Sequence, residues 1–126
     1  MSIRLKRAFE PAAPDDGLRV LVERLWPRGL SKERAAVDLW LKDVAPSPEL
    51  RRWYGHEPAK WPEFRRRYRD ELQDRDEELA ELRRLVRNGP VTFVFGSRDT
   101  ERNSAVVLRE VVERRPETGE ESAAAA

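Results

Sequence analysis

Residues 19–29 read Arg19-Val20-Leu21-Val22-Glu23-Arg24-Leu25-Trp26-Pro27-Arg28-Gly29, and this stretch decides the fold. Its first half is an apolar, β-branched run, which predicts a buried strand. Its second half predicts a turn, because Pro27 and Gly29 suit the second and fourth positions of a β-turn. A buried strand that ends in a turn carrying Arg24, Trp26 and Arg28 is typical of a binding loop on a rigid scaffold.

Two further segments have the character of strands. The run Val91-Thr92-Phe93-Val94-Phe95 predicts a second buried strand, and residues 3–9 alternate apolar and basic side chains as an edge strand does. Helices between the buried strands imply a parallel pair, while the orientation of the first strand stays open. We therefore predict a small single α/β domain with a short, mostly parallel sheet flanked by helices, its strands at about 3–9, 18–25 and 91–96.

The first helices are predicted from capping residues and apolar spacing. Ser31 is expected to cap a helix over 32–44, although alternation through Val37, Leu39 and Leu41 fits a strand almost as well. Ser47-Pro48-Glu49 combines an N-cap, a proline at the first helical position and an acid in the first turn. This segment predicts a short helix that ends at Gly55.

Residues 61–87 carry a helical stripe that lapses over 73–76. Two consecutive helices with a hinge are expected, and one long helix is the alternative. Gly89 is expected to end the second helix in the left-handed conformation. Asp99 is expected to cap the last helix.

The composition excludes several classes of site. The 126 residues predict one domain at 1–116 and, because the polar stretch at 117–126 ends in four alanines, a disordered tail. No cysteine and a single histidine leave no thiolate chemistry or multi-His centre, so neither metal nor cofactor is expected. The 25 basic and 24 acidic residues nearly cancel, so the chain has no overall attraction to nucleic acid or membrane. The N-terminus lacks a signal sequence, which predicts a cytoplasmic protein. The oligomeric state stays open.

The candidate site follows from the predicted topology. In parallel sheets ligands bind beyond the carboxyl ends of the strands, and both buried strands end in loops that combine glycine with arginine. Each side chain also has a structural alternative: ion pairs for the arginines, the core for Trp26, and a helix cap for Asp99. The candidate ligand-binding residues are Arg24, Trp26, Arg28, Ser97, Arg98 and Asn103.

Three classes of function remain. The first is binding of a small phosphorylated, carboxylated or nucleotide-like anion. The second is a metal-independent hydrolase or transferase with Glu23 or Asp99 as catalytic carboxylate. The third is nucleic-acid binding by the arginines at 65–69, which is not favoured because Phe64 and Tyr68 place those arginines on a solvated face. His56 is interpreted as a solvated loop residue.

Several motifs together resemble one known family. The segment Leu21 to Gly29, with its Trp-Pro-Arg-Gly motif, Trp40-Leu41-Lys42-Asp43 and Gly55-His56-Glu57-Pro58 are similar to the YeaO-like family of small bacterial proteins, a domain of unknown function (488). The resemblance covers about residues 2–112 and supports the α/β fold. It implies aspartate where Glu23 stands and often histidine at Ser104, so this chain departs from the family pattern within the candidate site.

Overall fold

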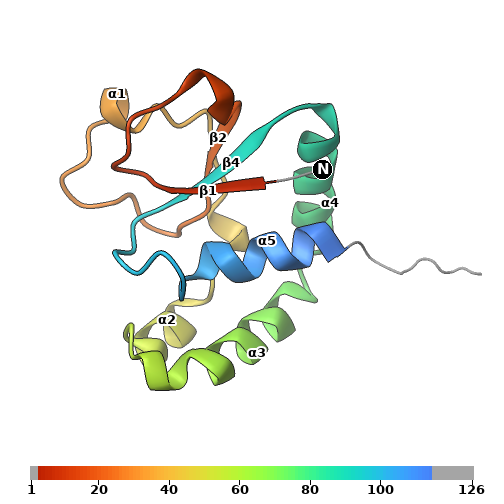
Figure 1. The fold of residues 1–126 in the computed structure, drawn as a ribbon. Coiled ribbons are helices and arrows are strands. Elements are labelled where there is room, and N and C mark those ends of the chain that lie inside the picture. Colours follow the sequence, from red (N-terminus) through yellow and green to blue (C-terminus); the bar gives the residue numbers. More distant parts are fainter. Residues whose placement is uncertain (1–2, 115–126) are drawn as a thin grey trace, which may run out of the picture.

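Four parallel strands form the sheet of residues 3–114, the part of the chain that the computed structural model describes (Figure 1). They are β1 (Ile3–Arg7), β2 (Leu18–Leu21), β3 (Leu39–Trp40) and β4 (Val91–Phe95), in the order β1-β4-β2-β3. Val20 of β2 lies opposite Phe93 of β4, which confirms the predicted parallel pair. β1 is also parallel to β4 and lies at the edge, so its orientation is now known.

The helices of this region lie in two groups. They are α1 (Lys32–Ala35), α2 (Pro48–Tyr54), α3 (Trp61–Leu72), α4 (Asp76–Asn88) and α5 (Ser104–Arg114), with short 3-10 turns η1 (Pro14–Asp16), η2 (Lys42–Val44) and η3 (Pro58–Lys60). Figure 1 shows α2, α3 and α5 on one side of the sheet and α1 on the other. The side chains of Ser31 and Ser47 cap α1 and α2 as predicted. The predicted break near residues 73–76 is confirmed, because α3 and α4 are two separate helices.

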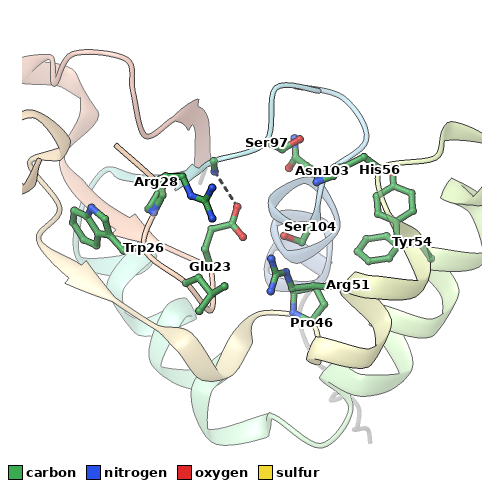
Figure 2. A pocket seen from close by; sticks show the side chains of 14 residues that line it. Glu23, Trp26, Arg28, Pro46, Arg51, Tyr54, His56, Ser97, Asn103 and Ser104 are labelled. Carbon is green, nitrogen blue, oxygen red and sulfur yellow. Dashed lines mark hydrogen bonds between the residues drawn. The ribbon is translucent and has the colours of Figure 1, made fainter. Parts of the chain in front are cut away.

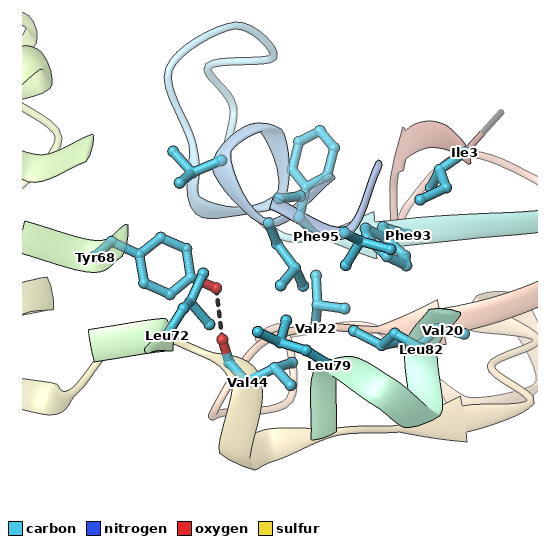
Figure 3. Close-up of a cluster of buried hydrophobic side chains, with 14 of the residues drawn as sticks. Ile3, Val20, Val22, Val44, Tyr68, Leu72, Leu79, Leu82, Phe93 and Phe95 are labelled. Atoms are coloured by element: carbon cyan, nitrogen blue, oxygen red, sulfur yellow. Dashed lines mark hydrogen bonds between the residues drawn. The ribbon is translucent and has the colours of Figure 1, made fainter. Parts of the chain in front are cut away.

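Both faces of the sheet are buried, as expected for parallel strands. Alternate side chains of β2 and β4 point to opposite faces, so Val20 and Phe93 join the larger core against α2–α5 (Figure 3). Leu21 and Val94 point the other way and pack with Trp26, in a smaller cluster that includes Ala35 of α1. This smaller cluster fastens the segment after β2 to the sheet.

The helix predicted over 32–44 is wrong beyond its first turn. Ala36 has a φ of 49°, a left-handed conformation that ends α1 after four residues. The carboxylate of Asp38 then accepts a 2.9 Å hydrogen bond from the backbone N–H of Arg19, which starts the pairing of β3 with β2. The alternation noticed in the sequence was the correct signal, because a fourth strand satisfies the free edge of β2.

Other element ends differ by a few residues. β2 ends at Leu21 instead of residue 25, because the N–H of Gly96, just past β4, donates to the side chain of Glu23. β1 ends at Arg7 rather than residue 9, and β4 ends at Phe95. Gly89 has a φ of 160°, so it is extended rather than left-handed as predicted.

A buried ionic cluster holds η1 against the sheet. The side chains of Asp16 and Arg19 are 1% and 2% exposed, and Arg19 Nη1 lies 2.8 Å from Asp16 Oδ2. Lys6 of β1 reaches the same carboxylate at 2.9 Å. Burial raises the pKa of Asp16, but hydrogen bonds from Lys6, the Ala13 backbone and Arg19 outweigh it and lower this pKa to about 2.

Two further expectations concern the C-terminal residues and membrane-spanning helices. The predicted tail at 117–126 lies outside the described residues, so the domain limits of 1–116 stay a prediction. Within residues 3–114, every helix is too short or too polar to cross a bilayer.

Candidate functional site

A cavity of about 350 Å³ lies at the carboxyl ends of β2 and β4, the two central strands (Figure 2). Three segments contribute most of its lining, and Phe64 of α3 adds to them. The loop after β2 contributes Glu23 and Arg28, the segment around α2 contributes Arg51, and the loop after β4 leads into α5. The lining residues are Glu23, Leu25, Trp26, Pro27, Arg28, Pro46, Arg51, Tyr54, His56, Phe64, Gly96, Ser97, Asn103 and Ser104. The predicted convergence of two strand-end loops therefore exists in the structure.

Two tryptophan side chains hold the loop after β2 in place through hydrogen bonds to its backbone. The indole N–H of Trp26 donates to the carbonyl of Leu30 at 2.6 Å, and that of Trp40 donates to the carbonyl of Glu23 at 2.6 Å. The two rings pack edge to face, with their centroids 5.5 Å apart. Trp26 thus has the core role weighed in the sequence, although its ring also borders the cavity.

The turn in this loop lies one residue further along the chain than predicted. The N–H of Leu30 donates to the carbonyl of Pro27, so Pro27 occupies the first position of the turn. Gly29 occupies the third position with a φ of 80°, the left-handed conformation that a type II turn requires there. The turn leaves Arg28 exposed at its second position, facing the cavity.

The loop after β4 is held by its own polar side chains. Ser97 Oγ accepts a 3.1 Å hydrogen bond from the Asp99 N–H and donates to its carbonyl. The Asp99 carboxylate caps a turn rather than α5, because it accepts hydrogen bonds from the N–H groups of Glu101 and Arg102. Asn103 is the cap of α5, since its Oδ1 accepts from Val106 N–H at 3.2 Å. The Asp99 prediction is corrected accordingly.

Glu23 is the acidic group of the cavity. Its Oε2 atom accepts a 2.9 Å hydrogen bond from the N–H of Gly96, which joins the two strand-end loops. Burial raises the pKa of Glu23 above its usual value, against the lowering effects of the Gly96 hydrogen bond and of the charges on Arg51 and His56. A carboxyl group in this environment can serve as a ligand group or as a proton donor and acceptor.

Arg51 and His56 are site residues that the sequence reasoning did not select. Arg51 lies on α2, and His56 follows the helix end at Gly55, where both residues have a left-handed backbone with φ values of 53° and 59°. This conformation is uncommon for histidine, and together with Gly55 it turns the chain back toward the cavity. The sequence predicted the short helix and its end at Gly55. It could not show that this helix meets the loops after β2 and β4 at the cavity, because those loops are distant from it in the sequence.

The predicted ligand-binding residues divide into two groups. Trp26, Arg28, Ser97 and Asn103 line the cavity, whereas Arg24 and Arg98 do not. Arg24 borders a separate hollow beside Tyr68, where its guanidinium donates to the carbonyls of Ala45 at 3.2 Å and Pro46 at 3.4 Å. Arg98 is exposed on its loop.

The structure also places the other charged features. Arg65 pairs with Glu110 of α5 at 2.6 Å, while Arg66 and Arg67 both pair with Glu63. Arg66 and Arg67 are exposed and paired on α3 itself, as the solvated-face interpretation expects, whereas Arg65 is half-buried and pairs across to α5. Within residues 3–114, no three Asp, Glu or His side chains are grouped as a metal centre would require.

These features define a small α/β protein with a parallel sheet and a charged cavity at its strand ends. The chain belongs to the family described as the inactive DUF488-N3 subclade, whose model matches residues 2–126. It is 39% identical over 108 residues to the uncharacterized protein YeaO of Escherichia coli, covering 86% of this chain and 94% of YeaO. This identity confirms the YeaO-like resemblance.

Other relatives come from mycobacteria. Uncharacterized proteins of Mycobacterium tuberculosis and Mycobacterium bovis are 47% identical over 110 residues, which cover 87% of this chain and 92% of each relative. No solved structure matches the chain at the significance required. The names of these relatives state no activity.

Proposed function

We propose that the protein binds a small anionic ligand in the cavity at the carboxyl ends of β2 and β4. One observation carries this proposal. Arg28 and Arg51 both line the cavity, and within residues 3–114 neither guanidinium group forms a hydrogen bond or an ion pair with the protein. Guanidinium groups match carboxylate and phosphate oxygens in a planar, bidentate geometry, so both are available for such a ligand.

The surroundings favour the same ligand class. His56 adds an imidazole to the lining, and the Ser104 hydroxyl is a neutral hydrogen-bonding group on the first turn of α5. Pro27, Pro46 and Phe64 add apolar lining that can contact the carbon atoms of a ligand. A cavity of about 350 Å³ matches the size of a small metabolite rather than a polymer.

The second candidate is a metal-independent hydrolase or transferase in the same cavity. The raised pKa of Glu23 supports it, because a general acid or base needs a pKa shifted toward neutral pH. Two observations weigh against it. The family is described as an inactive subclade, and hydrogen bonds from the backbone N–H groups of Glu101 and Arg102 hold the pKa of Asp99 low. Binding without turnover is therefore the function that we prefer.

Anion titrations of single-arginine variants test the proposal. Inorganic phosphate and pyrophosphate are the probes, with thermal shift and calorimetry as readouts, since ligand at 100 times its dissociation constant adds about 2.7 kcal/mol of stability. We expect Arg28→Gln and Arg51→Gln each to weaken binding by roughly tenfold or more. Arg98→Gln is the matched control, because Arg98 lies on an adjacent loop but outside the cavity. No binding by either anion or by any organic phosphate, or equal loss in the control, would contradict the proposal.

A further inference from the structure

The cavity carries charge of both signs, and the opposite charges do not neutralise each other by contact. Figure 2 shows the Glu23 carboxyl pointing into the cavity, with Arg28 on one side and Arg51 on the other. Within residues 3–114 neither arginine forms an ion pair with Glu23, so no partner there takes up the charge of either. Each charged group thus keeps hydrogen-bonding capacity directed at the cavity.

Glu23 has one oxygen in use and one free. Oε2 accepts from Gly96 N–H, whereas Oε1 has no hydrogen-bond donor among the described residues. An ionised carboxylate has about four acceptor positions on its two oxygens. A structural tether between the two loops needs only Oε2, and a glutamine would serve that purpose equally well. The free oxygen therefore points to a second use.

A purely anionic ligand would use only part of this arrangement. It would gain from Arg28 and Arg51 but would place its negative charge beside an ionised Glu23. A ligand that also carried an N–H donor would satisfy Oε1 and offset the desolvation of the carboxylate. The apolar lining, including the exposed Leu25, then contacts the carbon chain between the two polar groups.

We infer that the ligand is amphoteric: a small molecule whose anionic group binds Arg28 and Arg51 and whose primary ammonium, or a similar N–H donor, binds Oε1 of Glu23. This inference deepens the proposed function and rests on it. It names a chemical class, in which aminoalkyl phosphates and amino acids share an anion and a cation on a short carbon chain. Glu23 is then a specificity-determining residue that distinguishes amphoteric ligands from simple anions.

Matched probe pairs test the inference. Each pair differs only at the terminal group: O-phosphoethanolamine with propyl phosphate, 3-aminopropyl phosphate with butyl phosphate, and 4-aminobutyl phosphate with pentyl phosphate. The series samples the spacing between the two charged groups. We expect at least one amine to bind the wild-type chain roughly tenfold more tightly than its alkyl partner, the effect of one charge-assisted hydrogen bond. Calorimetry measures both affinities under one buffer condition.

Glu23→Gln is the decisive variant. Its amide oxygen can still accept from Gly96 N–H, so the loop connection is kept while the charge is lost. We expect the preference for the amine to disappear, and the alkyl phosphate to bind as tightly as before or more tightly. Glu101→Gln is the control, because Glu101 is an exposed acid outside the cavity, and it should preserve the preference. Thermal unfolding of each variant verifies that it is folded.

The outcomes separate the two proposals. Equal binding of amine and alkyl partners throughout the series overturns the amphoteric ligand and leaves anion binding intact. A preference that survives Glu23→Gln also overturns it, because the carboxylate is then not the partner. Failure of every probe, together with failure of phosphate and pyrophosphate, overturns anion binding itself.

Discussion

The side chain of Glu23 and the backbone of Gly96 join the loops that follow the two central strands, through a hydrogen bond of 2.9 Å. β2 ends two residues before Glu23, and β4 ends immediately before Gly96. The hydrogen bond thus connects the two strand-end loops on the side of the sheet where the cavity lies. It explains why a carboxyl group can be partly buried here, since a main-chain donor satisfies one of its oxygens.

This contact predicts different effects for two substitutions of Glu23. Glu23→Ala leaves the Gly96 N–H without its acceptor, and we expect stability to fall by about 1–3 kcal/mol. Glu23→Gln keeps an acceptor but removes a carboxyl group whose pKa is raised by burial. Its stability at pH 7 should therefore equal or exceed that of the wild type. Urea denaturation measures both. Equal destabilisation by the two changes would show that the hydrogen bond is not the important interaction.

Substitution of Arg24 and substitution of Arg28 should change the stability of the protein by different amounts, although only four positions separate the two residues. Arg24 donates to the carbonyls of Ala45 and Pro46, so Arg24→Gln should lower the free energy of unfolding by about 1–3 kcal/mol. Arg28 makes no such contact, so Arg28→Gln should stay within about 0.5 kcal/mol. Chemical denaturation of the two variants side by side provides the measurement. A larger loss for Arg28→Gln would show that it is a structural residue.

Acid should destabilise the fold through Asp16. Its folded pKa of about 2 lies below the usual 3.8, so its contribution is complete above pH 3.8 and is lost as the pH falls toward 2. The shift corresponds to roughly 2 kcal/mol. We expect Asp16→Asn to remove this dependence and, by leaving the buried Arg19 charge without its partner, to cost roughly 3–5 kcal/mol at pH 7.

Asp15→Asn is the matched control for that experiment. Asp15 is the adjacent acid, 65% exposed, and pairs with Arg4 at the surface, where ion pairs contribute little. Its variant should retain the stability of the wild type and the same loss on acidification. Denaturation curves between pH 2 and pH 7 distinguish the three proteins.

Gly17 should tolerate no side chain. Its φ is 65°, and a Cβ atom would overlap the carbonyl of Pro90, which accepts a 3.0 Å hydrogen bond from Leu18 N–H and so cannot move freely. We expect Gly17→Ala to cost about 3 kcal/mol or more. Gly29→Ala is the control, because Gly29 also has positive φ but no atom lies within 4 Å of the Cβ position. Its cost should be about 1–2 kcal/mol, from backbone strain alone.

Features that depend on local chemistry could be predicted from the sequence. The run Val91–Phe95 is apolar except for Thr92, a pattern that favours a strand buried on both faces. Ser47 and Gly55 delimit α2, because capping requires only neighbouring backbone groups. The parallel pairing and the two strand-end loops followed from the order of these elements. The general location of the candidate site was therefore predictable.

Which side chains meet at the candidate site depends on contacts between distant segments. Arg24 and Arg28 have the same chemistry, and a loop has no period that would show which of them faces the cavity. Arg51 reaches the site because Tyr54 of α2 stacks on Phe64 of α3 at 4.3 Å, a contact between separate helices. Leu39 and Trp40 form a strand rather than a helix because the edge of β2 was free to pair. Such choices depend on contacts between distant segments, and packing selects among local conformations that the sequence alone leaves nearly equal in free energy.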